Sequence, residues 1–460
     1  ARLAAFGSTR RPGMAAEDDP NLTVLLAAGT PVTTIVGKAS AEQVRLVLGV
    51  QLSENLAMIA DSIRLLKSAG REVMFDAEHF FDGYRQDPDY SLACLRAARA
   101  AGADVVILCD TNGGMLPSDV AGVCRRVVKD LDCVIGIHTH NDGELAVANA
   151  IAAVEAGARQ VQGTINGYGE RVGNCNLCSL IPNLQLKRNV ECLSAESVER
   201  LTELSRYVSE VGNAPHSLKL PYVGTEAFAH KAGYHVNAVV KGSHTYEHVS
   251  PGAVGNQRQI LISDLSGRSN ITQKLAGLGL SVTDEHVVPL LRHLKRQEHQ
   301  GMVYEDADAS FELLVRRAGG SHDPGFVLQA YTVTTRHRGR TDGSEATVKV
   351  RVHGDDFMAV AEGVGPVHAL DSALRLALLC FYPHLANVRL ADYKVRVVDN
   401  ESGTAARVRV WIQATDGHRS WCTVGASPNI VSASAAALVD SLEFSLLRTE
   451  RTAAPRRRTG

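Results

Sequence analysis

The feature that most constrains the fold is an alternation, across the first 190 residues, of short β-branched runs with segments of helical periodicity. Such an alternation is typical of parallel βα units, in which each strand is followed by a helix that packs on the sheet. The predicted strands are Leu3–Phe6, Val32–Val36, Glu72–Asp76, Val105–Cys109, Val134–Ile137 and Gln160–Thr164. Amphipathic helices with glycine near their ends are predicted at Leu52–Ala69, Tyr90–Ala101, Asp119–Lys129 and Glu144–Ala156.

The number of units bears on the architecture. These strands make six βα units, whereas a closed TIM barrel has eight, and the first predicted strand starts at the N-terminus of the chain. We therefore predict an α/β fold over residues 1–190, a (β/α)8 TIM barrel that lacks its first two βα units. The alternative is an open doubly wound sheet, although no G-x-G-x-x-G follows a strand to support a dinucleotide site.

The segment HTHND follows the predicted strand Val134–Ile137. Side chains two apart on an extended segment point the same way, so His138 and His140 present two imidazoles together. They lie at the carboxyl end of a strand, where α/β barrels keep their chemistry. An H-x-H pair alone fits either two hydrogen-bonded polar residues at a strand end or part of a divalent metal site.

Three further polar residues follow neighbouring strands: Glu78 in DAEHFFDGY, Thr111 in DTNGG, and Asn174 at the end of a glycine-rich loop. Each also has a structural interpretation. Glu78 could be a solvated carboxylate, Thr111 a turn former or helix cap, and Asn174 an N-cap for a helix beginning near Asn176. The glycines of residues 163–173 favour function, because they let the backbone turn tightly and approach a ligand.

Composition excludes several classes of partner. A formal net charge of −2 gives no reason to expect nucleic acid or an anionic membrane surface. No apolar run approaches the roughly 18 residues of a membrane span. Nine cysteines at irregular spacing fit a reduced cytosolic protein better than a disulfide framework. Cys175 and Cys178 form a lone C-x-x-C, a weak signal for structural zinc.

A family resemblance extends over nearly the whole chain, in the segments FGSTRRPG, DAEHFFDGY, LCDTNGG, HTHND, QGTINGYGERVGNCNLCSLIPNLQLK, AFAHKAGYHVNAV and LSGRSN. Together they resemble the bacterial citramalate synthase family, in the group that includes α-isopropylmalate and homocitrate synthases. The resemblance implies a metal-dependent barrel that condenses acetyl-CoA with a 2-oxo acid.

The same resemblance implies roles for the residues at the strand ends. His138 and His140 would be ligands of a divalent metal (Mn, Mg, Co or Zn), with Asn174 a weaker third contact. Thr111 would contact the oxo acid, and Glu78 would be the active-site carboxylate.

The chain also departs from the family pattern. Members open with a D-x-T-x-R-D-G segment, whose Arg steadies the oxo-acid oxygen and whose following Asp is a metal ligand, and this segment does not occur in the chain. Two imidazoles and an amide should hold a hard cation less well than a set containing a carboxylate. We therefore expect residues 1–460 alone to be a fragment, catalytically silent and poorly soluble because of open sheet edges.

Residues 191–320 are predicted to form linker subdomains, beginning with a helical stretch at Ser194–Gly212. In the family this region supplies a proton-transfer pair to the partner subunit's barrel. By that resemblance His235, in AGYHVNAV, is the candidate base or base-assisting residue, and Tyr246, in HTYEH, is its companion.

Residues 321–447 contain an internal repeat, because Ala346–Val352 and Ala406–Ile412 each lead through a turn and a second strand to an amphipathic helix. Pro366 and Pro428 are placed at the two helix starts. The unit resembles the regulatory domain of the α-isopropylmalate synthase family, which dimerises and binds the pathway's end product; a domain that only dimerises is the alternative. Residues 448–460 are predicted to be a disordered tail.

The resemblance therefore implies a homodimeric, cytoplasmic acyltransferase that condenses acetyl-CoA with pyruvate to citramalate and is inhibited by isoleucine. A 2-isopropylmalate or homocitrate synthase would share every motif. A metal-dependent lyase should lack the C-terminal repeat, and a catalytically inactive dimeric effector-binding fragment is the non-enzyme alternative.

Overall fold

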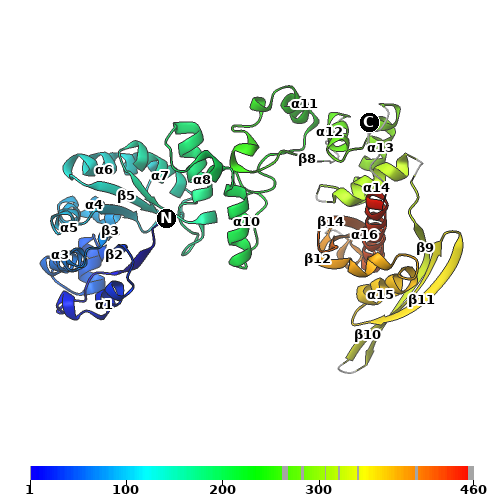
Figure 1. Ribbon diagram of the computed structural model, residues 1–460, viewed down its shortest axis with the longest axis horizontal. Helices are drawn as coiled ribbons and strands as arrows, with labels where there is room; N and C mark the ends of the chain where they lie inside the picture. The colour runs from blue at the N-terminus through cyan, green and yellow to red at the C-terminus, as the bar shows by residue number, and fades with distance from the viewer. Residues whose placement is uncertain are drawn as a thin grey trace. The chain divides into compact units, whose positions relative to one another are not determined.

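The computed structural model describes residues 2–261, 268–280, 284–305, 307–319, 322–338, 341–398 and 402–453. The start of the LSGRSN segment lies outside these residues. The chain forms two compact units, one made of Ala1–Phe228 with Val249–Gln257 and the other of Ala229–His248 with Arg258–Gly460 (Figure 1).

The first unit is built on a six-stranded parallel sheet whose strands lie side by side in sequence order. The strands are β1 (Ala4–Ser8), β2 (Val32–Lys38), β3 (Glu72–Glu78), β4 (Val105–Asp110), β5 (Val134–Thr139) and β6 (Gln160–Gln162). All six predicted strands are confirmed. A doubly wound sheet reverses its strand order at a switch point, and this order does not, so the barrel-type interpretation holds over the alternative.

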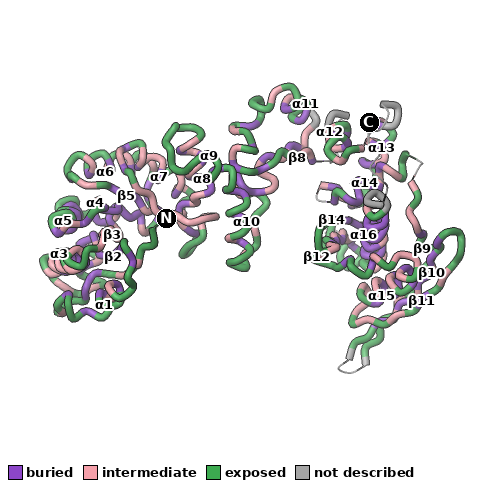
Figure 2. Tube along the Cα trace, in the orientation of Figure 1, coloured by how far each residue is buried: buried purple, intermediate pink, exposed green. Residues whose placement is uncertain are grey.

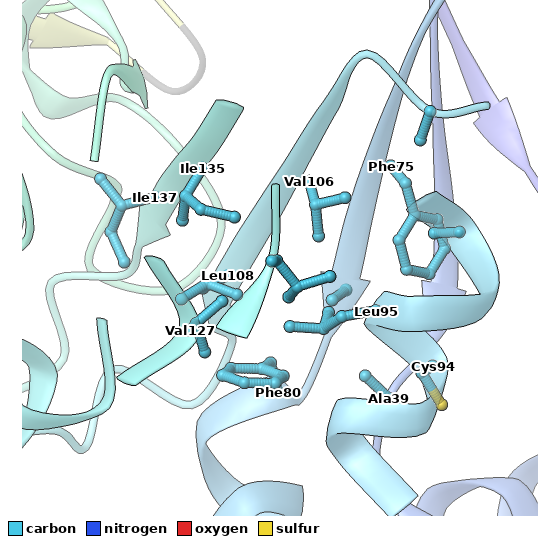
Figure 3. Packing of buried hydrophobic residues seen from close by; sticks show 14 of the residues in the cluster. Ala39, Phe75, Phe80, Cys94, Leu95, Val106, Leu108, Val127, Ile135 and Ile137 are labelled. Carbon is cyan, nitrogen blue, oxygen red and sulfur yellow. The ribbon is translucent and has the colours of Figure 1, made fainter. Parts of the chain in front are cut away.

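Helices cover one face of this sheet. They are η1 (Ala16–Asp18), α1 (Pro20–Ala27), α2 (Ala41–Gln43), η2 (Val44–Leu48), α3 (Leu52–Ser68), α4 (Phe80–Gln86), α5 (Pro88–Ala100), α6 (Pro117–Asp130), α7 (Ala146–Glu155), α8 (Leu177–Pro182) and η4 (Asn183–Lys187), while the single turn η3 (Ile165–Gly167) belongs to the glycine-rich loop after β6. The main core lies between helices and sheet, where Phe75, Val106 and Leu108 from the strands meet Leu95 and Val127 from the helices (Figure 3).

The opposite, inner face of the sheet has a smaller apolar cluster of Met74, Val105, Ile107 and Cys109. Successive residues of a strand point to opposite faces, so these side chains alternate with those of the main core. Every residue of β4 is buried, which explains why its sequence is a continuous apolar run. The first unit closes with α9 (Ala195–Val198), α10 (Leu201–Val211) and η6 (Pro251–Val254), the first two within the predicted helical stretch.

The second unit begins with a short parallel pair, β7 (Ala229–His230) with β8 (Gln259–Ile260). Its helices before the repeat are α11 (Gly233–Lys241), η5 (Ser243–Thr245), α12 (Arg268–Gly277), α13 (Asp284–His299) and α14 (Asp308–Ala318).

The predicted repeat is present as two copies of a three-stranded antiparallel sheet followed by a helix. The first copy is β9 (Phe326–Arg338), β10 (Thr341–Val352), β11 (Asp355–Gly363) and α15 (Pro366–Leu378); η7 (Pro383–Asn387) follows it. The second copy is β12 (Arg389–Val397), η8 (Gly403–Ala405), β13 (Val408–Thr415), β14 (Ser420–Ser427) and α16 (Ile430–Ala453).

Two details of the repeat differ from the sequence prediction. The first strand of each copy, β9 and β12, was not predicted; β12 is an edge strand with mostly exposed residues, so it lacks a clean alternation. Pro366 does begin α15, but Pro428 lies two residues before Ile430, the first residue of α16. The cap of α16 is Asn429, whose side-chain oxygen accepts from the backbone N–H groups of Val431 and Ser432.

Helix α16 contains a stretch, Ile430–Thr449, that is long and apolar enough to span a membrane, contrary to the sequence expectation. However, 67% of that stretch is buried inside the structure, and the helix packs on β13 and β14 (Figure 2). It therefore has the character of a core helix. It also extends through Arg448 to Ala453, which the sequence assigned to the tail, while residues 454–460 lie outside the described part.

Candidate active site at the strand ends

His138, His140 and Asn174 lie together at the carboxyl end of the parallel sheet. His138 belongs to β5, and His140 forms an isolated bridge with Asn174 at the end of the glycine-rich loop. The Nε2 atoms of the two histidines are 3.3 Å apart, and the Asn174 amide nitrogen is 3.3 Å from Nε2 of His138. The three side chains that the sequence proposed for a metal therefore converge on one point.

The environment keeps both imidazoles neutral. Burial lowers the pKa of His138, and burial together with the positive charge of Arg171 lowers the pKa of His140. Nδ1 of His140 is buried with no hydrogen-bond partner among the described residues. Neutral imidazole is the form that binds metals.

The donor set fits a divalent cation. Two imidazole nitrogens face each other with the Asn174 amide beside them, and a half-turn of that amide would bring its oxygen toward the same point. Among the described ranges no group of three or more His, Cys, Asp or Glu side chains could hold a metal. His138, His140 and Asn174 are therefore all neutral donors, and further ligands of a divalent cation bound there would have to be oxygen atoms from elsewhere.

Glu78 is the last residue of β3 and is ion-paired with Lys38, the last residue of β2. Nζ of Lys38 lies 2.6 Å from Oε2 of Glu78, and both side chains are largely buried. Glu78 is therefore not the solvated loop carboxylate of the alternative interpretation. Sequence reasoning missed Lys38; its signal was a lysine at the carboxyl end of a predicted strand.

Thr111 lies in the turn after β4 and caps no helix. Its hydroxyl accepts from the backbone N–H of His79 at 2.8 Å, and its carbonyl accepts from Arg171 Nη2 at 2.7 Å. Arg171 also binds both carboxylate oxygens of Asp142, at 2.7 and 2.9 Å. Arg171 thus links the loops that follow β4, β5 and β6, a role that sequence reasoning did not find.

Backbone strain accompanies these loops. His79 and Arg171 have φ angles of 57° and 58°, in the left-handed region that non-glycine residues rarely adopt. Such conformations persist where the surroundings hold them, often at functional sites. The N-cap of α8 is Asn176, whose side chain accepts from the backbone N–H of Cys178, so the capping interpretation of Asn174 is wrong.

His235 and Tyr246 lie together in the second unit. Their ring centroids are 4.3 Å apart, and both side chains are exposed. The next residue, Glu247, is buried and bound by Arg258 through both oxygens and by His230. This buried ion pair fixes the backbone next to Tyr246.

Comparison with known proteins covers both units. Three family models match consecutive parts of the chain: HMGL-like at residues 11–208, homocitrate synthase post-HMGL domain-like at 222–302, and LeuA allosteric (dimerisation) domain at 305–446. (R)-citramalate synthase of Aquifex aeolicus is 48% identical over 98% of this chain and 86% of its own length. The Synechocystis (R)-citramalate synthase is also 48% identical, over 97% of this chain and 84% of its own length.

This chain belongs to the (R)-citramalate synthase family. A probable 2-isopropylmalate synthase of Methanopyrus kandleri is less similar, at 34% identity over 85% of this chain. Membership of the family confirms the predicted α/β class, with an HMGL-like catalytic barrel domain and a LeuA-type C-terminal domain. It also confirms that the chain is an acyltransferase rather than a binding module.

Proposed function

We propose that this chain catalyses the condensation of acetyl-CoA with pyruvate to (R)-citramalate, with His138, His140 and Asn174 holding a divalent cation. The supporting observation is the convergence of two neutral Nε2 atoms at the strand ends, in a chain 48% identical to curated (R)-citramalate synthases. A cation bound there supplies Lewis-acid polarisation of the 2-oxo group and a template for it. The 2-isopropylmalate alternative is less supported, because the relatives of that name are less similar.

Glu78 and Thr111 are proposed to act on the two substrates. The acetyl methyl group is a weak carbon acid, so a base must be held within reach of it. The ion pair with Lys38 holds the Glu78 carboxylate at the strand end, where it can orient the acetyl group or take part in proton transfer. Thr111 is kept in place by its bonds to His79 and Arg171 and is assigned to the oxo acid.

His235 with Tyr246 is the proposed proton-transfer pair. Their ring contact brings an imidazole and a phenol together on an exposed surface. Exposure is required if the pair acts on a substrate that is bound by another part of the enzyme. His235 would accept the acetyl proton, directly or through Tyr246 or water.

The C-terminal unit is proposed to be the dimerisation and effector-binding part, with isoleucine as the effector. A cavity of about 360 Å³ lies between α15 and the second repeat. Leu390, Ile412 and Leu438 offer an apolar wall for an aliphatic side chain. In the same cavity Oδ1 of Asp371 is buried with no hydrogen-bond partner among the described residues, and it can accept a hydrogen bond from an α-ammonium group.

A thiol-release assay with pyruvate, 2-oxoisovalerate and 2-oxoglutarate tests the proposed reaction. Pyruvate should give the highest kcat/KM, and a higher value for either larger acid would overturn the citramalate assignment.

A further inference from the structure

A hydrogen-bonded chain runs beneath the proposed metal ligands. Nδ1 of His138 lies 2.8 Å from Oε1 of Gln162, and Nε2 of Gln162 donates to Oδ1 of Asp76 at 2.8 Å. The three residues belong to β5, β6 and β3. This series of hydrogen bonds starts at Nδ1 of His138, whereas Nε2 of the same ring faces His140 and Asn174.

The contact between Gln162 and Asp76 spans two intervening strands. In the sheet, β4 and β5 lie between β3 and β6. Side chains of β3 and β6 can meet only across the inner face of a sheet that curves strongly, as in a barrel. The inner face thus carries a polar link between strands that share no backbone hydrogen bond.

The direction of the chain sets the tautomer of His138. Nε2 of Gln162 donates to Oδ1 of Asp76, an oxygen that can accept this bond in either protonation state of the carboxyl group, so the amide presents its NH₂ group to β3 and its oxygen to His138. The imidazole must then carry its proton on Nδ1 to donate to that oxygen. Nε2 keeps its lone pair, and it is this nitrogen that lies 3.3 Å from both neighbours.

The buried carboxyl group of Asp76 lowers the stability of the fold, which argues against a purely structural role for it. Asp76 is 5% exposed, and its side chain accepts a hydrogen bond from Gln162. Its neighbours on the inner face, Met74, Ile107 and Cys109, are apolar. Burying a carboxylate with so little compensation destabilises a fold, and an apolar residue would fill the space more favourably.

We infer that Gln162, oriented by Asp76, is a positioning residue that fixes the proton of His138 on Nδ1 and so presents Nε2 as a metal-binding lone pair. The inference rests on the metal site of the proposed function. Ligating histidines generally donate their second ring N–H to a partner that sets tautomer and orientation. In this site that partner is the Gln162 amide, which Asp76 of β3 holds across the inner face of the sheet.

The test is Mn²⁺ binding, measured on the purified protein by the electron paramagnetic resonance signal of free Mn²⁺. Gln162→Leu should weaken binding about 10- to 100-fold, the range typical of a residue that hydrogen-bonds a metal ligand. Asp76→Asn retains an acceptor for the amide and should bind close to the wild-type value. Gln160→Leu is the matched control, since Gln160 lies two residues earlier on the same strand and its buried Oε1 has no partner among the described residues.

His138→Ala separates the two proposals. If His138→Ala binds Mn²⁺ as the wild type does, the proposed metal site is wrong. If it loses binding while Gln162→Leu retains wild-type affinity, only the positioning role is overturned. Should Gln162→Leu not fold, ¹⁵N spectra of histidine-labelled wild-type protein decide: we expect the Nδ1–H tautomer for the resonances that His138→Ala removes, and the Nε2–H tautomer would overturn the inference.

Discussion

Lys38 and Glu78 face each other at the ends of neighbouring strands, with Nζ of the lysine 2.6 Å from Oε2 of the glutamate. They are register partners in the parallel pairing of β2 with β3, so the ion pair follows directly from the alignment of the two strands. An ion pair this sheltered holds its carboxylate more firmly than one on an exposed surface.

Replacing Lys38 by methionine should lower kcat by roughly tenfold or more, because the Glu78 carboxylate loses the partner that orients it. Glu78→Gln should cost more, on the order of the 10²- to 10⁴-fold that a general acid–base group contributes. Steady-state thiol release measures both. Lys67→Met is the control, since Lys67 is on α3 and pairs with Asp104 at the amino-terminal end of β4, away from the carboxyl ends of the strands; an equal loss in that variant would refute a specific role for Lys38.

His138→Ala and His140→Ala should each lower turnover more than about 100-fold, because each removes a proposed metal ligand. Removing a residue that only hydrogen-bonds a ligand typically has a smaller effect, of about 10- to 100-fold. Dialysis against a chelator should silence the wild-type enzyme, and adding back a divalent cation should restore it. His418→Ala is a suitable control, because His418 is an exposed residue in the turn between β13 and β14 of the C-terminal repeat. Near wild-type activity in either ligand variant contradicts the assignment.

The sequence predicted elements well where local pattern and burial agree. The parallel strands are β-branched runs with alternating or continuous burial, and the pairing of His138 with His140 needs only an extended backbone. Contacts set by register or curvature could not be predicted. Lys38 meets Glu78 because two strands align, and Gln162 meets Asp76 because the sheet bends.

Edge strands were harder to predict than central strands for a related reason. β12 has neither a continuous apolar run nor a strict alternation, because solvent rather than protein covers most of its residues. The sequence prediction places the start of α16 at Pro428, because proline is frequent in the first turn of a helix, whereas the structure has Asn429 as the cap. For β12 the missing information was tertiary, whereas the cap at Asn429 is a local interaction with the backbone N–H groups of Val431 and Ser432.

Asp76→Asn should raise the stability of the metal-free protein at neutral and higher pH. Burial raises the pKa of Asp76 from 3.8 to about 7, so the unfolded state ionises this group at a lower pH than the folded state. The free energy of unfolding therefore falls as pH rises from about 4 to 7, by on the order of 2–4 kcal/mol in total. Urea unfolding across that range should show a gain for the variant that disappears toward pH 4, and a gain independent of pH would contradict desolvation of the carboxylate as its cause.

His235→Asn should lower kcat by roughly 10²- to 10⁴-fold if this imidazole accepts the acetyl proton. Tyr246→Phe removes the phenolic proton but keeps the ring contact, so its loss should be smaller. KM for pyruvate should change little in either variant, because neither residue is proposed to bind the oxo acid. His244→Asn, on the exposed turn between them, serves as the control; an equal loss there would point to loop disruption instead.

Asp371→Asn should weaken inhibition by isoleucine while leaving turnover without effector unchanged. Arg375 holds one oxygen of Asp371 at 2.8 Å, and the other oxygen, buried in the cavity, is the proposed acceptor for the ammonium group. Removing the negative charge takes away a charge-assisted hydrogen bond, worth about 1.5–3 kcal/mol, so the inhibition constant should rise roughly 10- to 100-fold. Asp356→Asn is the matched control, since Asp356 pairs with Lys349 and Arg351 on the adjacent strand outside this cavity. Undiminished inhibition of Asp371→Asn would place the effector elsewhere, and absence of inhibition in the wild type would favour a C-terminal unit that only dimerises.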